Sequence, residues 1–153
     1  MMSCELHLTS AELCDRIKGN CGVYFLDGKT MSGKTAFVIS LCNGNANAHI
    51  TTGEKLIERL ICNTDNFDAV AEELKDYGII CVEDIDFFGG RPATEQVLAE
   101  LFGSLSEHSS VIVTGIEIQK RMKNMFMALG GFEYYNKSSE GWTLTDSKGG
   151  SML

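Results

Sequence analysis

The feature that most constrains this chain is one continuous eight-residue stretch, Gly28-Lys29-Thr30-Met31-Ser32-Gly33-Lys34-Thr35. The stretch fits the phosphate-binding pattern G-x-x-x-x-G-K-[ST] at every position. An apolar run at 23–26 precedes it and a helix-like segment at 36–41 follows it. The sequence therefore predicts a buried strand, a glycine-bearing turn and a helix. Such a turn directs free backbone N–H groups and the positive end of the helix dipole at one point, where a phosphate is held.

A second group of residues would complete a nucleotide site. In the phosphate-binding pattern, Lys34 reaches the β- and γ-phosphates and the Thr35 hydroxyl ligates Mg²⁺. Glu83 and Asp84 follow the apolar run 79–82. Acids at the end of a neighbouring strand hold Mg²⁺, directly or through water, and orient the attacking water. Thr114 ends the next apolar run and is a candidate γ-phosphate sensor. The alternatives are two solvated acids at the start of a loop and an ordinary threonine at a strand end.

Size and charge limit the classes of protein. A chain of 153 residues fits one domain with a proper core. We see no run long enough for a membrane span and no signal-peptide pattern. The net charge of -8 argues against direct DNA binding, because nonspecific nucleic-acid binders normally carry a broad basic surface. The small basic cluster of Lys120, Arg121 and Lys123 is interpreted as a solvated helix face.

Cysteine usage points to a reducing compartment. The six cysteines are scattered without a C-x-x-C pair, and several lie in apolar runs. Most of them are interpreted as small buried hydrophobic residues, and a cytoplasmic location is expected. The three histidines do not cluster with them, so no zinc site is expected.

Apolar periodicity alternates between helix-like and strand-like segments. Helices are predicted at 9–17, 36–41, 52–61, 67–74, 94–105 and 118–129, the first opened by a capping box and the segment 43–45 forming a turn. Strands are predicted at 22–26, 48–51, 79–82 and 111–114, with a C-terminal hairpin of 132–135 and 142–145. The alternation predicts a three-layer α/β fold with a mainly parallel sheet. We expect a single P-loop NTPase-like domain over 1–147 and a disordered tail at 148–153.

With both halves of the site placed, the chain resembles the AAA+ ATPase domain of the bacterial replication initiator DnaA and its relatives, the initiator homologues and helicase loaders. The most specific stretch is Ile79-Ile80-Cys81-Val82-Glu83-Asp84-Ile85-Asp86-Phe87-Phe88-Gly89-Gly90-Arg91. The similarity covers about 22–132 and includes the amphipathic helix after this stretch. The resemblance implies an AAA+-like fold, binding of ATP or ADP with Mg²⁺, and a role in DNA replication.

Three departures from that family bear on activity. Glu83 stands where the family usually has Asp. Asn124-Met125-Phe126 stands where the family's arginine finger is expected, and Arg121 would replace that arginine only in a shifted or rotated helix. The sequence given ends before a helical lid or a DNA-binding domain. The resemblance therefore implies weak ATP hydrolysis or none.

Three functions remain open at this stage. The leading hypothesis is a DnaA-like P-loop protein that binds nucleotide and acts as a regulator or accessory factor in replication, with homo-oligomers as an open alternative. The rival is a non-catalytic interaction module that keeps the AAA+ core and binds a replication protein or another AAA+ protein. A small P-loop kinase is the third, disfavoured because such enzymes need an arginine-rich lid.

Overall fold

The computed structural model of the chain describes residues 6–29, 33–43, 47–62, 66–85, 91–139 and 141–148. These residues form one seven-stranded sheet in the order β1-β7-β6-β2-β5-β4-β3. The strands are β1 Leu6–Leu8, β2 Gly22–Asp27, β3 Ala48–Thr52, β4 Ile79–Glu83, β5 Ser110–Gly115, β6 Phe132–Ser138 and β7 Gly141–Lys148. The helices are α1 Ser10–Gly19, α2 Lys34–Cys42, α3 Gly53–Cys62, α4 Asn66–Leu74, α5 Pro92–Leu105, α6 Ile118–Arg121 and α7 Lys123–Ala128.

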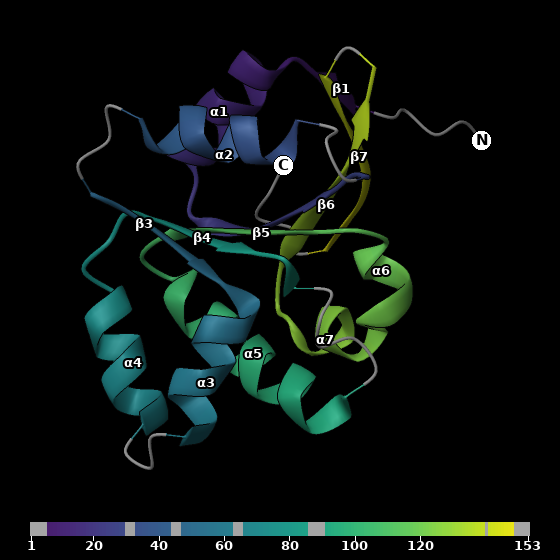
Figure 1. Ribbon diagram of the computed structural model, residues 1–153. Coiled ribbons are helices and arrows are strands. Elements are labelled where there is room, and N and C mark those ends of the chain that lie inside the picture. Colours follow the sequence, from purple (N-terminus) through teal and green to yellow (C-terminus); the bar gives the residue numbers. More distant parts are fainter. Residues whose placement is uncertain are drawn as a thin grey trace.

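Helices cover both faces of the parallel part of this sheet. α1 and α2 lie on one face, and α3, α4, α5 and α7 lie on the other (Figure 1). Each face has its own apolar core, one around Phe25 and Phe102 and the other around Leu26 and Leu41. The three-layer α/β prediction is therefore confirmed.

The central strands are apolar at nearly every position because both of their faces are covered. β2 pairs in parallel with β5, with Val23 opposite Val111 and Phe25 opposite Val113. β4 pairs with β5 on its other side, and β3 pairs with β4. In a parallel sheet all carboxyl ends lie at one edge. The ends of β2, β4 and β5 are therefore neighbours, as the sequence predicted.

A predicted capping box starts α1. The Thr9 hydroxyl accepts a hydrogen bond from the Glu12 backbone N–H at 3.1 Å, and the Glu12 carboxylate accepts one from the Thr9 N–H at 2.8 Å. Two of the otherwise unpaired backbone donors at a helix start are satisfied in this motif.

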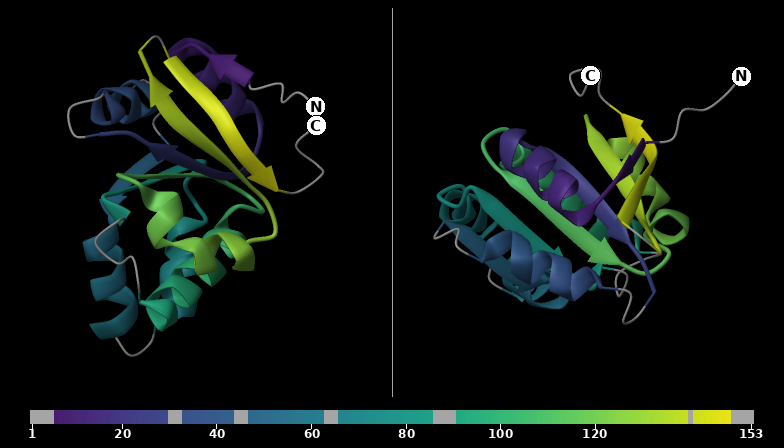
Figure 2. Two further views of the ribbon diagram at one scale, coloured as in Figure 1. Left: turned by 90° about the vertical axis from the view of Figure 1, so that its right-hand side faces the viewer. Right: turned by 90° about the horizontal axis from the view of Figure 1, so that it is seen from above.

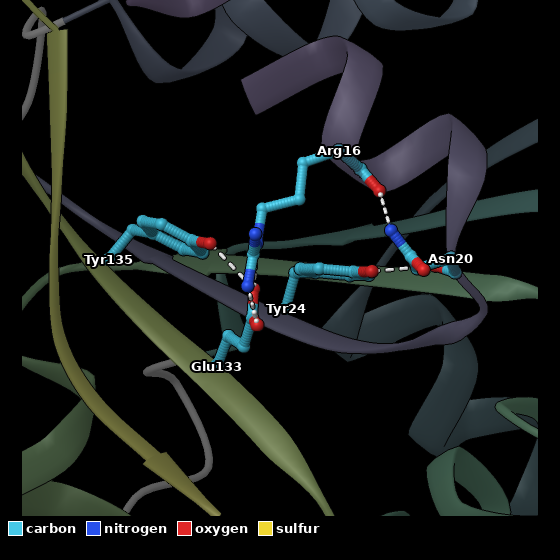
Figure 3. Close-up of polar contacts among 5 residues, drawn as sticks. All are labelled: Arg16, Asn20, Tyr24, Glu133 and Tyr135. Atoms are coloured by element: carbon cyan, nitrogen blue, oxygen red, sulfur yellow. Dashed lines mark hydrogen bonds and ion pairs between the residues drawn. The ribbon is translucent and has the colours of Figure 1, made fainter. Parts of the chain in front are cut away.

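An ion pair with a buried carboxylate fixes α1 against the sheet (Figure 3). Arg16 of α1 donates to both carboxylate oxygens of Glu133 on β6, from Nε at 2.9 Å and from Nη2 at 2.6 Å. Glu133 is fully buried, and the Tyr135 hydroxyl donates to the same carboxylate at 2.5 Å. The hydrogen bond to Glu133 is the main reason that the pKa of Arg16 is raised. Because the carboxylate has three donors, its negative charge is held inside the protein.

The C-terminal hairpin extends the sheet. β6 pairs in parallel with β2, and β7 pairs antiparallel with β6 (Figure 2). The predicted hairpin is confirmed, but its strands are longer than expected. Lys148 ends β7, whereas the sequence had assigned it to the tail, and 149–153 lie outside the described residues.

β1 was not predicted. It pairs antiparallel with β7, with Leu8 opposite Trp142. Three residues are too few for an alternating pattern to be recognised, and this strand forms only because β7 provides an unpaired edge.

The single helix predicted at 118–129 is wrong. The chain forms α6 and α7, separated at Met122, whose φ of -118° and ψ of 41° are not helical. Backbone hydrogen bonds continue across the break, from the Met122 N–H to the Ile118 carbonyl and from the Phe126 N–H to the Met122 carbonyl. Met122 and Met125 are fully buried. Their packing in the core, and not local helix propensity, therefore decides the backbone conformation here.

Candidate functional site

The lysine of the phosphate-binding pattern lies at the joint between two strand ends. Lys34 is the first residue of α2, and its ammonium donates to the Gly28 carbonyl and, at 2.9 Å, to the Gly115 carbonyl at the end of β5. Gly115 also accepts from the Gly28 N–H at 3.2 Å. The positive charge therefore lies at the carboxyl edge of the sheet, where β2 and β5 meet.

The second glycine of the pattern has the geometry that the turn requires. Gly33 is the N-cap of α2 and has a φ of 104°, in the left-handed region that glycine adopts without steric cost. Its carbonyl accepts the first helical hydrogen bond, from Phe37 at 2.9 Å. Lys29 is exposed, and Thr30, Met31 and Ser32, which the sequence also assigned to nucleotide binding, lie outside the described residues.

The loop and the acidic strand end are in contact. The Thr35 hydroxyl, in the first turn of α2, donates a hydrogen bond to the Glu83 carboxylate at the end of β4, and Lys34 is close enough to affect the charge of Glu83. Asp84 follows with a φ of 59°, a left-handed conformation that is uncommon for a residue with a side chain. Residues 48 positions apart in the sequence thus meet as the pattern predicted.

The ionised form of the Glu83 carboxyl is disfavoured in this position. Burial and then the neighbouring negative charge of Asp84 raise the pKa of Glu83, while the hydrogen bond from Thr35 and the charge of Lys34 partly oppose the rise. A group with this shift favours a nearby cation, because the cation stabilises the ionised form.

This shift predicts a pH-dependent stability. A carboxyl whose pKa is higher in the folded protein binds more protons there, so the free energy of unfolding falls as the pH rises from its ordinary value of 4.5 through the raised value. Above that window the ionised carboxylate opposes folding. We therefore expect Glu83→Gln to raise the free energy of unfolding at neutral pH without Mg²⁺, and the difference from the wild type to vanish below a pH of about 4.

Urea unfolding across a pH series measures this difference. The exposed Glu107 provides the control, since Glu107→Gln should not change the free energy of unfolding at any pH. A Glu83→Gln protein that is less stable than the wild type at neutral pH would contradict the electrostatic account.

The donor set fits a hard divalent cation. Thr35 and Glu83 offer a hydroxyl and a carboxylate in mutual contact, with a second carboxylate on the adjacent Asp84. Oxygen ligands of this kind suit Mg²⁺, which takes few protein ligands and completes its shell with phosphate and water. Among the described residues, no group of three or more His, Cys, Asp and Glu side chains gathers as a self-contained metal site.

The predicted sensor threonine is close to this site. Thr114 lies on β5, opposite Leu26 of β2, and directly precedes Gly115, which accepts from Lys34. Thr114 is 2% exposed. Its place in the sheet agrees with the prediction, and its proposed role as a phosphate sensor remains a prediction.

Asp27, the last residue of β2, is a functional candidate that was not predicted. Its buried carboxylate accepts from the Glu117 N–H at 2.8 Å and from the Ile118 N–H at 3.1 Å, and also from the Tyr134 hydroxyl. Asp27 therefore fixes the start of α6 and Tyr134 of β6 to the strand that leads into the phosphate loop. A lone acid that ends an apolar strand was the available signal.

A cavity of about 650 Å³ adjoins the loop on the α6 side. Asp27, Gly28 and Lys29 line it from the loop, Gln119 and Lys120 from α6, and Tyr134, Asn136, Lys137 and Ser138 from β6. A hollow of this size is sufficient for a small-molecule ligand.

Comparisons with known proteins agree with this geometry. No protein-family model matches the chain, and no curated protein sequence matches it. Replication initiator DnaA bound to AMPPCP and single-stranded DNA matches with a TM-score of 0.63 at 13% identity, over 84% of this chain and 44% of that chain. Domain III of DnaA from Thermotoga maritima matches with a TM-score of 0.58 at 16% identity, over 84% and 59%.

A helicase structure also has a similar fold. A structure of two coordinating Pif1 helicases at forked double-stranded DNA matches with a TM-score of 0.58 at 16% identity, over 90% of this chain and 44% of that chain. The chain thus spans less than two thirds of each of these proteins. Within the described residues, no helix has both the length and the apolar character needed to cross a bilayer.

Likeness at these identities is evidence of fold. The parallel core with the phosphate-loop segment between β2 and α2, the helices on both faces and these matches all agree. The chain has the three-layer α/β fold of the P-loop NTPases, AAA+-like in its neighbours, with a C-terminal β-hairpin added to the sheet.

Proposed function

We propose that this chain is a P-loop protein that binds ATP or ADP with Mg²⁺ and acts as a regulator or accessory factor in DNA replication. The observation that supports it most is the hydrogen bond from Thr35 to Glu83 beside Lys34. A helix start, a lysine and an acidic strand end then occupy one corner of the sheet. These are the groups that phosphate binding and metal binding require together.

Each residue has a defined task in this proposal. The backbone N–H groups of the loop and the start of α2 hold the phosphate oxygens, and Lys34 leaves its two carbonyl partners to neutralise the β- and γ-phosphates. Thr35, Glu83 and Asp84 hold the metal and its water, and Thr114 senses the γ-phosphate. When bound, Mg²⁺ neutralises the charge on the phosphate oxygens.

Hydrolysis is proposed to be slow. Phosphoryl transfer gains a factor of roughly 10³–10⁵ from an arginine finger. α7 carries Asn124 and Phe126 where the resemblance expects that arginine, and Arg121 ends α6 with an exposed side chain. Glu83 in place of Asp also changes the position of the carboxylate that would orient the water.

The role in replication is supported by the neighbours' functions, which include a replication initiator bound to single-stranded DNA and a DNA-unwinding helicase. The net charge of -8 supports action through a protein partner rather than through tight DNA binding of its own.

Isothermal calorimetry with ATP and ADP in the presence of Mg²⁺ tests the proposal. Heating and centrifuging the purified protein, followed by mass spectrometry of the supernatant, detects nucleotide that co-purifies. We expect saturable binding that weakens when EDTA removes Mg²⁺. No binding heat at millimolar nucleotide in a sample that carries no nucleotide would refute the proposal.

One observation favours the alternative, a non-catalytic interaction module. Met127 on α7 is 69% exposed and lines a second cavity of about 600 Å³ with Phe126 and Phe132. An exposed methionine suits an adaptable protein contact. A structure of katanin that concerns its self-assembly matches with a TM-score of 0.53 at 12% identity, over 84% of this chain and 56% of that chain. Size-exclusion chromatography with and without nucleotide discriminates, since a nucleotide-dependent change of assembly supports the leading proposal.

A further inference from the structure

Lys137 is a basic residue that the phosphate-loop pattern does not include, yet it lies at the loop. It is on β6, one residue beyond Asn136, which pairs with Asp27 at the end of β2. A methyl group built on Gly33 would lie 3.5 Å from Lys137 Cε. The aliphatic part of Lys137 therefore packs beside Gly33, the N-cap of α2, although more than a hundred positions separate the two residues in the sequence.

The ammonium of Lys137 is held in place by the hairpin. Nζ donates to the Ser138 carbonyl at 2.7 Å and lies 5.7 Å from the centre of the Trp142 ring. Trp142 is fully buried and packs against Phe37 of α2, with ring centres 5.3 Å apart. A carbonyl oxygen and an aromatic face both favour a cation, so the positive charge has a defined position.

This position is electrostatically unusual. The N-terminus of a helix is positive, and it favours anions rather than cations. Lys34 places a second positive charge at the same helix start. Of the acidic groups nearby, the Asp27 carboxylate already accepts from two backbone N–H groups and from Tyr134, and Glu83 accepts from Thr35. An anion at the helix start would interact favourably with both lysines.

The cavity beside the loop joins these features. Lys137 lines it together with Gly28 and Lys29, so the space next to the loop is continuous with the space around Lys137. Among the described residues, the two acids that line the same cavity already have partners, Asp27 in backbone N–H groups and Glu117 in Lys120, which leaves Lys29 and Lys137 as its other charged lining residues.

We infer that Lys137 is a second phosphate-binding cation, supplied by the β6–β7 hairpin of the same chain to the polyphosphate held at the loop. The inference rests on the proposed function and extends it. The hairpin then does more than extend the sheet, because it brings a positive charge to the nucleotide. The ligand class is a nucleoside di- or triphosphate.

Substitution of Lys137 tests the inference. We expect Lys137→Gln to weaken ATP·Mg²⁺ binding about tenfold in calorimetry, the size of one charge-assisted contact. Lys137→Arg, which keeps the charge, should restore most of the affinity. Lys120→Gln is the matched control, because Lys120 lines the same cavity but is paired with Glu117 at 3.3 Å and lies away from Gly33.

The wild-type protein offers a second readout. Trp142 is the single tryptophan of the chain, so its fluorescence reports on the charge near its ring. When the Lys137 ammonium turns from the ring toward a phosphate, the emission of Trp142 should shift on titration with ATP·Mg²⁺ or with inorganic tripolyphosphate. The same titration of Lys137→Gln should give a smaller shift. The wild-type titration by itself does not depend on how well the variant folds.

The outcomes separate the two proposals. Absence of nucleotide binding by the wild type refutes the proposed function, and the inference with it. If the wild type binds and Lys34→Ala does not, but Lys137→Gln binds with wild-type affinity, the nucleotide function stands and the inference is refuted. Unchanged Trp142 emission at saturating nucleotide also refutes it.

Discussion

Lys34→Ala is expected to weaken ATP·Mg²⁺ binding by about 100-fold or more. A hydrogen bond to a charged group contributes about 1.5–3 kcal/mol, and a lysine that contacts two phosphates makes two such bonds. Each 1.4 kcal/mol corresponds to about a factor of ten in affinity, so their joint loss amounts to about two factors of ten. Isothermal calorimetry measures the change directly, and circular dichroism establishes that the variant is folded.

Two further variants sharpen this result. Lys34→Arg should also bind poorly, because the larger planar guanidinium does not fit the position beside two phosphates that the compact ammonium takes in the proposal. Lys18→Ala, in the last turn of α1, removes the same charge from a distant helix and should leave the affinity unchanged. Equal binding by Lys34→Ala and Lys18→Ala would refute the assignment of the phosphate site.

Arg16→Met is expected to lower the free energy of unfolding by about 3–5 kcal/mol, the usual cost of leaving one charge of a buried pair alone. Glu133 is fully buried, and after the substitution only the Tyr135 hydroxyl still donates to its carboxylate. For a chain of this size, about 1 kcal/mol changes the melting temperature by about 2–4 °C, so a fall of about 10 °C follows. Urea unfolding followed by circular dichroism measures the loss.

The chain contains a matched control for this experiment. Arg59 and Glu73 form a pair of the same chemistry whose side chains are 34% and 52% exposed. Exposed pairs contribute little, so Arg59→Met should cost less than about 1 kcal/mol. The double substitution Arg16→Met with Glu133→Met should recover part of the stability, because it removes the isolated charge as well as its partner. Equal losses in Arg16→Met and Arg59→Met would show that the buried pair has no special role.

Local signals predicted most of the elements correctly. The capping box at Thr9 predicts the start of α1, and the uninterrupted apolar runs predict β2, β4 and β5 as strands covered on both faces. These signals depend on neighbours within a few residues, so they can be recognised without the fold. The meeting of Thr35 with Glu83 also follows from the sequence, because carboxyl ends of parallel strands share one edge.

Other features required contacts between distant segments. β1 forms on the edge that β7 provides, and its three residues have no pattern of their own. The helix predicted at 118–129 is divided at Met122, which is buried, while Asp27 binds the backbone at the start of α6. The sequence of 118–129 alone does not predict that a carboxylate from another strand binds its backbone.

The sequence by itself determined the phosphate-binding pattern, the acidic strand end and the alternation that makes a three-layer fold. Tertiary structure alone decided which further side chains reach that pattern. Lys137 comes to the loop because β6 pairs with β2, and that pairing joins residues far apart in the chain. The physical reason is the sequence distance over which each effect acts. Turn and strand preferences depend on a few neighbouring residues, whereas the charged groups around an anion site depend on which strands lie side by side in the sheet.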